Sequence, residues 1–297
     1  MDKIQTLRIL VVSQKGGVGK STLSANLAAW YSEYSNRNTV LVDLDPHGSS
    51  SSWIKNARDC GVFHEHFVAN SFSERRWLID SRNKIRKHFG KFETLVCDLT
   101  WTAAMDPEFM HEFDLVIVPS SVSSIELNAT MKFLDSIKWV FEARAGIPPT
   151  LLICPSRVLD DQLTQDPFSK ENFLMPFLLL PPILDDPEIR TLFKEKFIFD
   201  FHRPSASAFL KCASSVQQAG DLHKKMNSKT RLKFSDRRVL DTNNTKLSRY
   251  MSQKTVKPLS ETSKNNYKSY FRPKKPRIIN KKISSLMKML SSSIVQK

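Results

Sequence analysis

The sequence contains little cysteine and no long apolar run, and both absences exclude classes of protein. Among its 297 residues the four cysteines lie far apart, without a C-x-x-C pair, at Cys60, Cys97, Cys154 and Cys212. Such spacing fits neither a disulfide framework nor a zinc knuckle. No stretch approaches the ~20 apolar residues of a membrane span, and the N-terminus lacks the charged and apolar regions of a secretory signal. We therefore expect a protein that is made and kept in the cytoplasm.

Positive charge is distributed unevenly along the chain. The formal net charge is +15, but residues 1–223 hold 24 basic and 27 acidic residues, whereas residues 224–297 hold 21 basic and 3 acidic residues. The second segment has few large apolar residues, so it cannot bury enough surface to offset its ordering entropy. We predict a body of residues 1–223 and a mostly disordered basic tail of residues 224–297, which suits a polyanionic partner.

One part of this tail differs from the rest. Residues 278–290 place apolar side chains at helical spacing beside lysines. This pattern predicts a short amphipathic helix, a feature that can meet an anionic membrane surface.

The body alternates short apolar runs with helical patterns. The runs, which are apolar at nearly every position as in strands buried on both faces, cover residues 7–13, 39–43, 94–98, 115–119 and 150–154. Helical patterns cover residues 21–35, 126–144 and 205–226. The alternation predicts an α/β fold with a doubly wound, mostly parallel sheet of the P-loop NTPase type, which binds ligands at the carboxyl ends of the strands. Residues 177–180 and 197–199 fit either strands or buried helix turns.

A glycine-rich segment, residues 13–22, connects the first predicted strand to the first predicted helix. Its glycines allow backbone N–H groups to converge on phosphate oxygens, and the helix presents its positive end. Lys20 can reach the β- and γ-phosphates, and Ser21 can ligate Mg²⁺. The segment predicts a nucleoside triphosphate site with the binding residues Lys15, Gly16, Gly17, Val18, Gly19, Lys20, Ser21 and Thr22.

The string K-G-G-V-G-K-S at residues 15–21 resembles the deviant Walker A motif of the ParA/MinD group of ATPases. In that group the first lysine reaches across a nucleotide-sandwich dimer to the phosphates of the partner subunit. The resemblance therefore implies that Lys15 acts across a dimer that forms on ATP, with ATP and Mg²⁺ as ligands. It covers about residues 7–223 and is most specific in the first hundred.

Two carboxylates alternate at the end of the second predicted strand. Asp43 and Asp45 belong to a segment that resembles the D-x-D-P-Q-G-N motif of ParA-type proteins, with His47 for the usual glutamine and Ser49 for the asparagine. Phosphoryl transfer needs groups that hold Mg²⁺ and position the nucleophile. We expect Asp43 to hold the Mg²⁺ shell and Asp45 to orient the attacking water.

The third predicted strand ends in Asp98, which resembles the aspartate that holds the metal through water in this family. The family continues D-[TA]-P-P, whereas this chain has Leu-Thr-Trp-Thr at residues 99–102, which alters the loop that senses the γ-phosphate. The predicted metal ligands are thus Ser21, Asp43 and Asp98. The predicted catalytic residues are Lys15, Lys20 and Asp45.

The resemblance implies a small ParA-like ATPase that dimerises on ATP, binds DNA without sequence preference and partitions plasmid or chromosomal DNA. Hydrolysis would be slow and stimulated by a ParB-like adaptor or another cargo protein, and the protein would be nucleoid-associated. We expect the tail to supply much of the DNA affinity. The alternative is that basic residues of the body, such as Arg190, Lys194 and Lys211, make the DNA contacts.

Two other functions fit the same motifs. One is a role in conjugative DNA transfer, as in VirC-type relatives. The other is a MinD-like membrane-cycling ATPase, with residues 278–290 as the lipid-binding helix. The long basic arm before that segment makes the membrane role the less favoured of the two.

Overall fold

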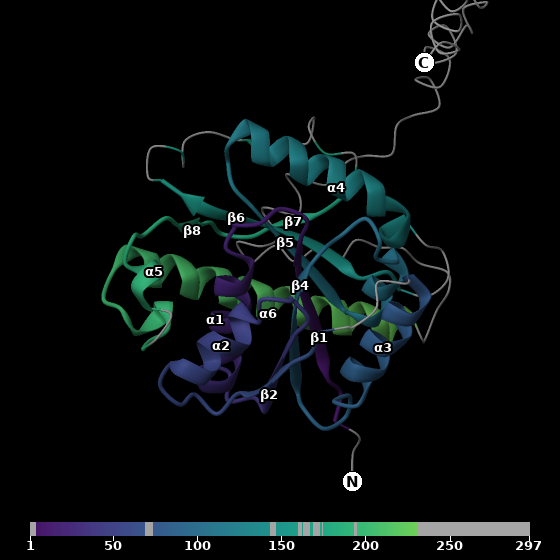
Figure 1. Cartoon of the computed structure of the whole chain (residues 1–297), viewed down its shortest axis with the longest axis horizontal. Coiled ribbons are helices and arrows are strands. Elements are labelled where there is room, and N and C mark those ends of the chain that lie inside the picture. The colour runs from purple at the N-terminus through teal and green to yellow at the C-terminus, as the bar shows by residue number, and fades with distance from the viewer. Residues whose placement is uncertain are drawn as a thin grey trace, which may run out of the picture. The chain divides into compact units, whose positions relative to one another are not determined.

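The computed structural model describes residues 4–68, 74–142, 147–159, 162, 167–168, 173, 175–192 and 195–230. These residues form an α/β fold in which helices lie on both sides of a parallel sheet (Figure 1). They all fall within one compact unit. The amphipathic segment at 278–290 and the tail beyond Thr230 lie outside the described residues.

The strand order of the sheet is β3-β2-β4-β1-β5-β6-β7, and β8 pairs with β6. Every strand pairing is parallel. The strand bounds are β1 Leu7–Ser13, β2 Thr39–Asp43, β3 Phe63–His66, β4 Thr94–Thr100, β5 Leu115–Ser120, β6 Thr150–Val158, β7 Leu178–Leu179 and β8 Ile183–Leu184. Strand β4 is inserted between β2 and β1, and the chain then continues to β5 on the other side of β1, so the strand order reverses its direction beside β1. This arrangement places the carboxyl end of β1 near the point where ligands bind in doubly wound folds.

Helices cover both faces of the sheet. Their bounds are α1 Lys20–Glu33, α2 Ser49–Asn56, α3 Glu74–Arg86, α4 Ser124–Glu142, α5 Ile189–Leu192 and α6 Pro204–Thr230, with 3₁₀ turns at Pro107–Glu112 and Ile198–Asp200. The residues of β1 alternate between two cores. Leu7, Ile9 and Val11 face α1 and α6, whereas Leu10 and Val12 face α3 and α4.

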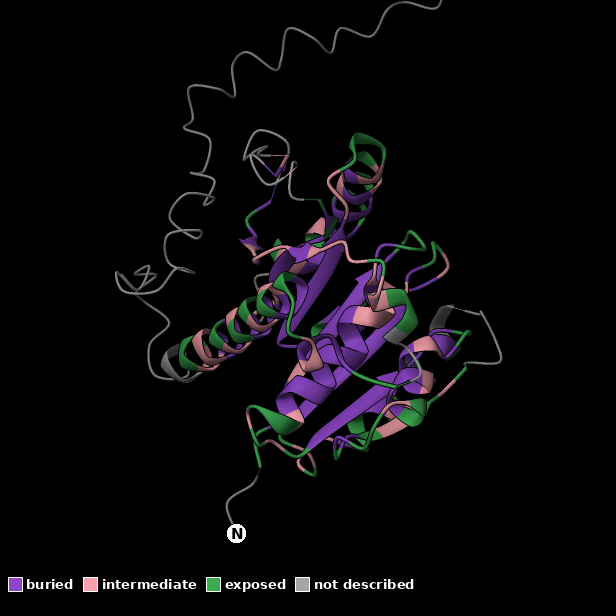
Figure 2. Ribbon diagram, turned by 90° about the vertical axis from the view of Figure 1, so that its left-hand side faces the viewer, coloured by how far each residue is buried: buried purple, intermediate pink, exposed green. Residues whose placement is uncertain are grey.

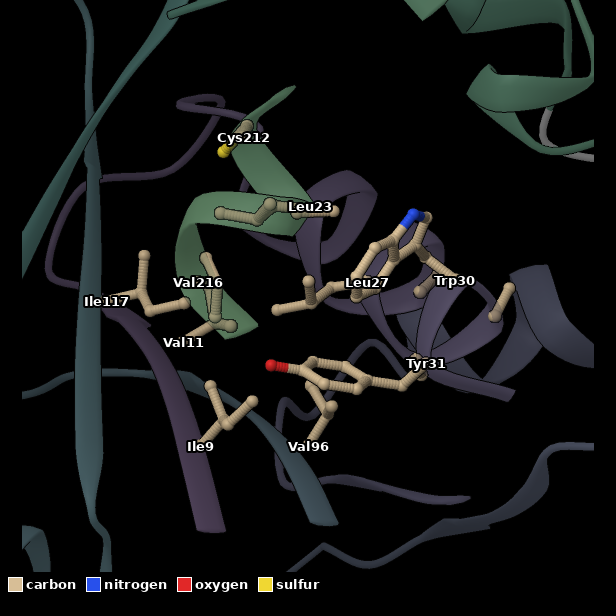
Figure 3. Close-up of a cluster of buried hydrophobic side chains, with 14 of the residues drawn as sticks. Ile9, Val11, Leu23, Leu27, Trp30, Tyr31, Val96, Ile117, Cys212 and Val216 are labelled. Carbon is tan, nitrogen blue, oxygen red and sulfur yellow. The ribbon is translucent and has the colours of Figure 1, made fainter. Parts of the chain in front are cut away.

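The buried residues are concentrated in the strands and on the helix faces turned toward them (Figure 2). In the core beside α1, Leu27 and Tyr31 of α1, Ile9 of β1 and Val216 of α6 belong to one buried cluster (Figure 3). Full burial of such side chains contributes about 1.5–3 kcal/mol each. This packing fixes α1, and with it the loop that precedes α1, against the middle of the sheet.

The predicted fold class is confirmed, and all five predicted strands begin where expected. Strands β1 and β2 also end as predicted, whereas β4, β5 and β6 run on by two, one and four residues. Helices α1, α4 and α6 occupy the predicted helical patterns. Of the two ambiguous segments, residues 177–180 contain the short strand β7, and residues 197–199 overlap the 3₁₀ turn Ile198–Asp200.

Helix α6 continues through the predicted body–tail boundary between His223 and Lys224 and reaches Thr230. The sequence marks a change of composition there, but the helix extends past it. Among the described residues, no helix combines the length and apolarity that crossing a bilayer requires.

Candidate nucleotide-binding site

The glycine-rich segment forms a loop between β1 and α1. Gly17 and Gly19 adopt φ angles of 81° and 84°, in the left-handed region that side chains disfavour. Gly19 precedes the first residue of α1, and neither a side-chain cap nor an acidic residue occupies the first helical turn. The N–H groups of this helix end therefore remain available to an anion.

A cavity of about 720 Å³ opens at this loop. Its lining comes from the glycine-rich segment of residues 13–22 (the phosphate loop), from Asp45 to His47 and Thr100, and from Ser156, Arg157, Ile183 to Asp186, Ile189 and Arg190. The volume falls within the usual range for small-molecule sites of roughly 300–1,000 Å³. The cavity is thus large enough for a nucleotide with its phosphates at the loop.

Lys20 lies at the floor of this site between two carboxylates. Its Nζ donates to Asp98 Oδ1 at 2.7 Å and to Asp45 Oδ2 at 3.0 Å, and its side chain is 7% exposed. Burial alone would lower the pKa of Lys20, but the negative charges of Asp98 and Asp45 outweigh burial and raise it. Lys20 is therefore held as a cation at the position where phosphate charge would arrive.

Asp98 is fully buried, and its Oδ2 has no hydrogen-bond partner among the described residues. Burial raises the pKa of Asp98, although the charge of Lys20 opposes the rise. An unpartnered buried carboxylate oxygen is costly unless a ligand satisfies it. Asp98, together with the Ser21 hydroxyl at the cavity wall, therefore fits a hard cation such as Mg²⁺ and its water shell.

Asp45 is held by several donors. Its Oδ2 accepts hydrogen bonds from Lys20 and from the Thr100 hydroxyl, and its Oδ1 accepts one from the His47 N–H at 3.0 Å. Burial would raise the pKa of Asp45, but the hydrogen bonds from Thr100 and His47 and the charge of Lys20 lower it to about 2. The carboxylate is thus ionised at neutral pH and can accept a proton or a hydrogen bond from water.

Asp43 is oriented differently from Asp45. It is fully buried, and its Oδ2 accepts hydrogen bonds from the Ser50 hydroxyl at 2.8 Å and the Ser51 N–H at 2.9 Å. Its Oδ1 accepts the N–H of Asp45 at 3.0 Å. These contacts join the end of β2 to the start of α2, and the metal role expected for Asp43 stays a prediction.

Lys15 lies at the rim of the cavity. Its side chain is 42% exposed and forms an ion pair with Glu126 Oε1 at 3.3 Å, in the first turn of α4. Lys15 and Lys20 are therefore in different settings, because Lys20 is buried between two carboxylates whereas Lys15 is partly exposed and paired with one. Sequence reasoning did not identify Glu126, which only the fold brings to the phosphate loop.

Two residues at the end of β6 support the phosphate loop from the opposite side. The Ser156 hydroxyl donates to the Val18 carbonyl at 2.7 Å, and Arg157 Nη1 donates to the Gly17 carbonyl at 3.1 Å. Arg157 has a φ angle of 56°, which is uncommon for a residue with a side chain. No motif in the sequence marks these residues, because their partners are about 140 positions away.

The fold and the site together define a P-loop ATPase of the ParA/MinD type. Residues 9–289 match the family described as the CobQ/CobB/MinD/ParA nucleotide binding domain, and the chain belongs to this family.

Curated relatives match over a shorter stretch. The chain is 42% identical over 64 residues to the chromosome-partitioning ATPase Soj of Thermus thermophilus, covering 22% of this chain and 25% of Soj. It is 47% identical over 61 residues to the chromosome partitioning protein ParA of Myxococcus xanthus, covering 20% of this chain and 21% of ParA. The matched stretches thus span about a quarter or less of these relatives.

Solved structures resemble the whole body. The apo form of McdA from Cyanothece superposes with a TM-score of 0.58 at 14% identity, covering 72% of this chain and 99% of McdA. The septum site-determining protein MinD from Pyrococcus horikoshii, complexed with Mg-ADP, gives a TM-score of 0.56 at 18% identity, covering 74% of this chain and 99% of MinD. At these identities the similarity shows the fold alone.

Proposed function

We propose that this chain is an ATPase that binds ATP with Mg²⁺, dimerises on doing so, and binds DNA without sequence preference to partition or position plasmid or chromosomal DNA. The observation that carries the proposal is the contrast between two lysines of one loop. Lys20 is buried between Asp45 and Asp98, whereas Lys15 is exposed at the cavity rim. Lys20 would serve the phosphates of its own site, and Lys15, whose ion pair with Glu126 is partly exposed, would serve those of the partner subunit.

ATP binding is supported by the residues that surround the cavity. The loop N–H groups and Lys20 would supply positive potential for the phosphates. Ser21, which lines the cavity, and Asp98, whose buried Oδ2 has no partner among the described residues, would supply oxygen ligands for Mg²⁺ and its water shell. Mg²⁺, when bound, would neutralise phosphate charge during transfer. Lys20 would exchange its carboxylate partners for phosphate oxygens.

Hydrolysis is supported by Asp45, which lines the cavity as an ionised carboxylate. In phosphoryl transfer the protein contributes mainly positioning and electrostatics, including a group that orients the attacking water. Asp45 has the charge and the location for that task. Its removal would slow hydrolysis while leaving the phosphate contacts of Lys20 in place.

DNA partition is supported by the similarity to Soj and ParA and by the charge of the tail. Lysine and arginine side chains that contact phosphates do not read base edges, so sequence preference should be absent. The membrane alternative depends on residues 278–290, and it predicts that this segment partitions to vesicles containing anionic lipid.

The decisive experiment measures the oligomeric state with ATP. Wild type should sediment as a dimer with Mg-ATP and as a monomer without nucleotide. Lys15→Gln should bind ATP yet remain monomeric, because the exposed rim lysine is lost while Lys20 is kept. Lys132→Gln, which alters an exposed lysine of α4 away from the cavity, is the matched control and should dimerise.

If Lys15→Gln dimerises with ATP as well as wild type does, Lys15 has no role across the dimer. If wild type stays monomeric with ATP, the proposed nucleotide-dependent dimer is wrong. Sedimentation velocity with and without nucleotide separates these outcomes.

A further inference from the structure

The segment after Asp98 departs from the proline-containing pattern of the resembling proteins, and its structure suggests a reason. Strand β4 continues to Thr100, which pairs in register with Ser13 of β1. The N–H of the next residue, Trp101, donates to the Ser13 carbonyl at 2.9 Å. A proline at position 101 has no N–H and could not make this bond.

The Trp101 side chain provides a second contact that holds the end of β4. The indole is 4% exposed and packs against Phe133 of α4, with ring centroids 6.0 Å apart. Backbone and side chain of Trp101 therefore both hold the strand end in place. Because Thr100 is the last paired residue of β4 and directly precedes this anchor, its hydroxyl is brought to a defined position at the cavity wall.

That hydroxyl meets Asp45. Thr100 Oγ1 donates to Asp45 Oδ2, the same oxygen that accepts from Lys20. Because Asp45 Oδ2 also accepts from the Lys20 ammonium, this oxygen is the acceptor and the threonine hydroxyl is the donor. Threonine is branched at Cβ and has few χ1 rotamers, which makes it a stiff support.

Nucleotide binding would change the set of hydrogen-bond donors that surround Asp45. Once Lys20 turns to phosphate, Asp45 Oδ2 loses its cationic partner and keeps Thr100 as its side-chain donor. The His47 N–H still holds Oδ1. Two hydrogen bonds, one on each oxygen, would then define the plane of the carboxylate and leave lone pairs on both oxygens for water.

We propose that Thr100 is a positioning residue for ATP hydrolysis, whose hydroxyl orients the Asp45 carboxylate toward the attacking water after Lys20 has engaged the nucleotide. The inference rests on the proposed ATPase function and deepens it. Trp101 contributes by holding the end of β4 so that the Thr100 hydroxyl reaches Asp45.

The test uses the full chain with two substitutions at position 100. Thr100→Val keeps the shape of the side chain and removes the hydroxyl, and it should lower kcat for ATP hydrolysis about 10- to 100-fold, the scale of a misplaced catalytic group. KM for ATP should stay within about twofold, because Thr100 acts through Asp45 in the transition state rather than on bound ATP. Thr100→Ser restores a hydroxyl and should recover most of the rate.

Thr94→Val is the matched control. Thr94 lies on the same strand, far from the site, and its buried hydroxyl has no hydrogen-bond partner among the residues that the structure describes. Its replacement should leave kcat unchanged. A loss of rate in this control would mean that any threonine-to-valine change in β4 disturbs the site, and would overturn the assignment of Thr100.

A binding measurement supplies a readout independent of turnover. Mg-ADP with aluminium fluoride imitates the transferring phosphoryl group, whereas Mg-ADP alone does not. Thr100→Val should weaken binding of the fluoride complex by about the factor lost in kcat and leave Mg-ADP affinity unchanged. An equal loss of affinity for both ligands would indicate a merely structural role and overturn the proposal.

The possible failures are distinguishable. If wild type and Asp45→Ala release phosphate equally, the proposed role of Asp45 fails, and the inference about Thr100 falls with it. If Asp45→Ala is slow while Thr100→Val matches wild type, the proposed function stands and only the Thr100 assignment is overturned. Failure of Thr100→Ser to recover the rate would likewise overturn it.

Discussion

Replacing Lys20 by methionine should destabilise the protein even without nucleotide. The substitution removes the ammonium group that lies 2.7 Å from Asp98 Oδ1 and 3.0 Å from Asp45 Oδ2. At an effective dielectric constant of about 20, each contact is worth about 6 kcal/mol of Coulomb attraction. Desolvation of the three charges offsets much of this, so the net loss on breaking such a buried network is about 3–5 kcal/mol.

The assay is urea unfolding of nucleotide-free protein at pH 7. Free energies of unfolding are compared with one common value for their dependence on urea concentration. Combining Lys20→Met with Asp98→Asn should recover about 1–3 kcal/mol, because the second change removes the fully buried charge that the first leaves without its cation. Lys15→Met is the matched control. Lys15 is exposed, and loss of its ion pair with Glu126 should cost at most about 1 kcal/mol.

Two results would refute this reasoning. If the free energy of unfolding of Lys20→Met lies within about 1 kcal/mol of the wild-type value, Lys20 does not compensate the charge of the buried carboxylates. Additive losses in the double variant would mean that Lys20 and Asp98 are energetically independent.

Further predictions concern hydrolysis, DNA binding and pH. Asp45→Ala should bind ATP and dimerise, yet release phosphate about 100-fold more slowly, because a lost water-orienting group raises the barrier by several kcal/mol; an unchanged steady-state rate would remove Asp45 from the mechanism. Deletion of residues 231–297 keeps all of α6 and removes 18 basic and 3 acidic residues, the whole net charge of +15. If six of these charges contact phosphates, a plot of log affinity against log salt concentration should have a slope of about −5 for the full chain and a shallower slope for the deletion variant. An unchanged slope would assign the DNA contacts to the body. Loss of vesicle binding with DNA binding intact would favour the membrane role. Burial lowers the pKa of His223, whose Nδ1 pairs with the Thr150 hydroxyl. The folded state thus favours neutral His223. Its contribution to the free energy of unfolding is complete above the unfolded pKa of about 6.5 and is lost as the pH falls through the folded pKa. The loss is at most about 1.4 kcal/mol per pH unit. Urea midpoints at pH 7.5 and 5.5 should therefore differ less in His223→Gln than in wild type, and equal differences would contradict the assignment.

The sequence predicted the middle of the sheet better than its edges. Strands β1, β2, β4, β5 and β6 are apolar at nearly every position because helices cover them on both faces. Strand β3 lies at the edge, and its sequence Phe-His-Glu-His shows no apolar run because its side chains are exposed or half-buried. Strands β7 and β8 have two residues each, too few for a periodic pattern. These two strands are recognised only by their pairing with β6 in the structure.

The same distinction applies to the site. Lys20 follows the loop after β1, Asp45 lies just after β2, and Asp98 lies near the end of β4. They could be predicted because parallel strands bring these ends together. Ser156 and Glu126 could not, because their contacts with the phosphate loop depend on where β6 and α4 pack against it. Short motifs predict local geometry, whereas the supports of that geometry come from distant parts of the chain.

The pair of carboxylates at the end of β2 shows why spacing alone does not assign chemistry. Asp43 is the last residue of the strand, and its side chain accepts three hydrogen bonds, from Asp45, Ser50 and Ser51. Asp45 lies two residues beyond the strand, where its side chain contacts Lys20 and Thr100. Asp43 thus holds the backbone of the turn on which Asp45 sits. The alternation places Asp43 in the hydrogen bonds of the turn and Asp45 at the wall of the cavity.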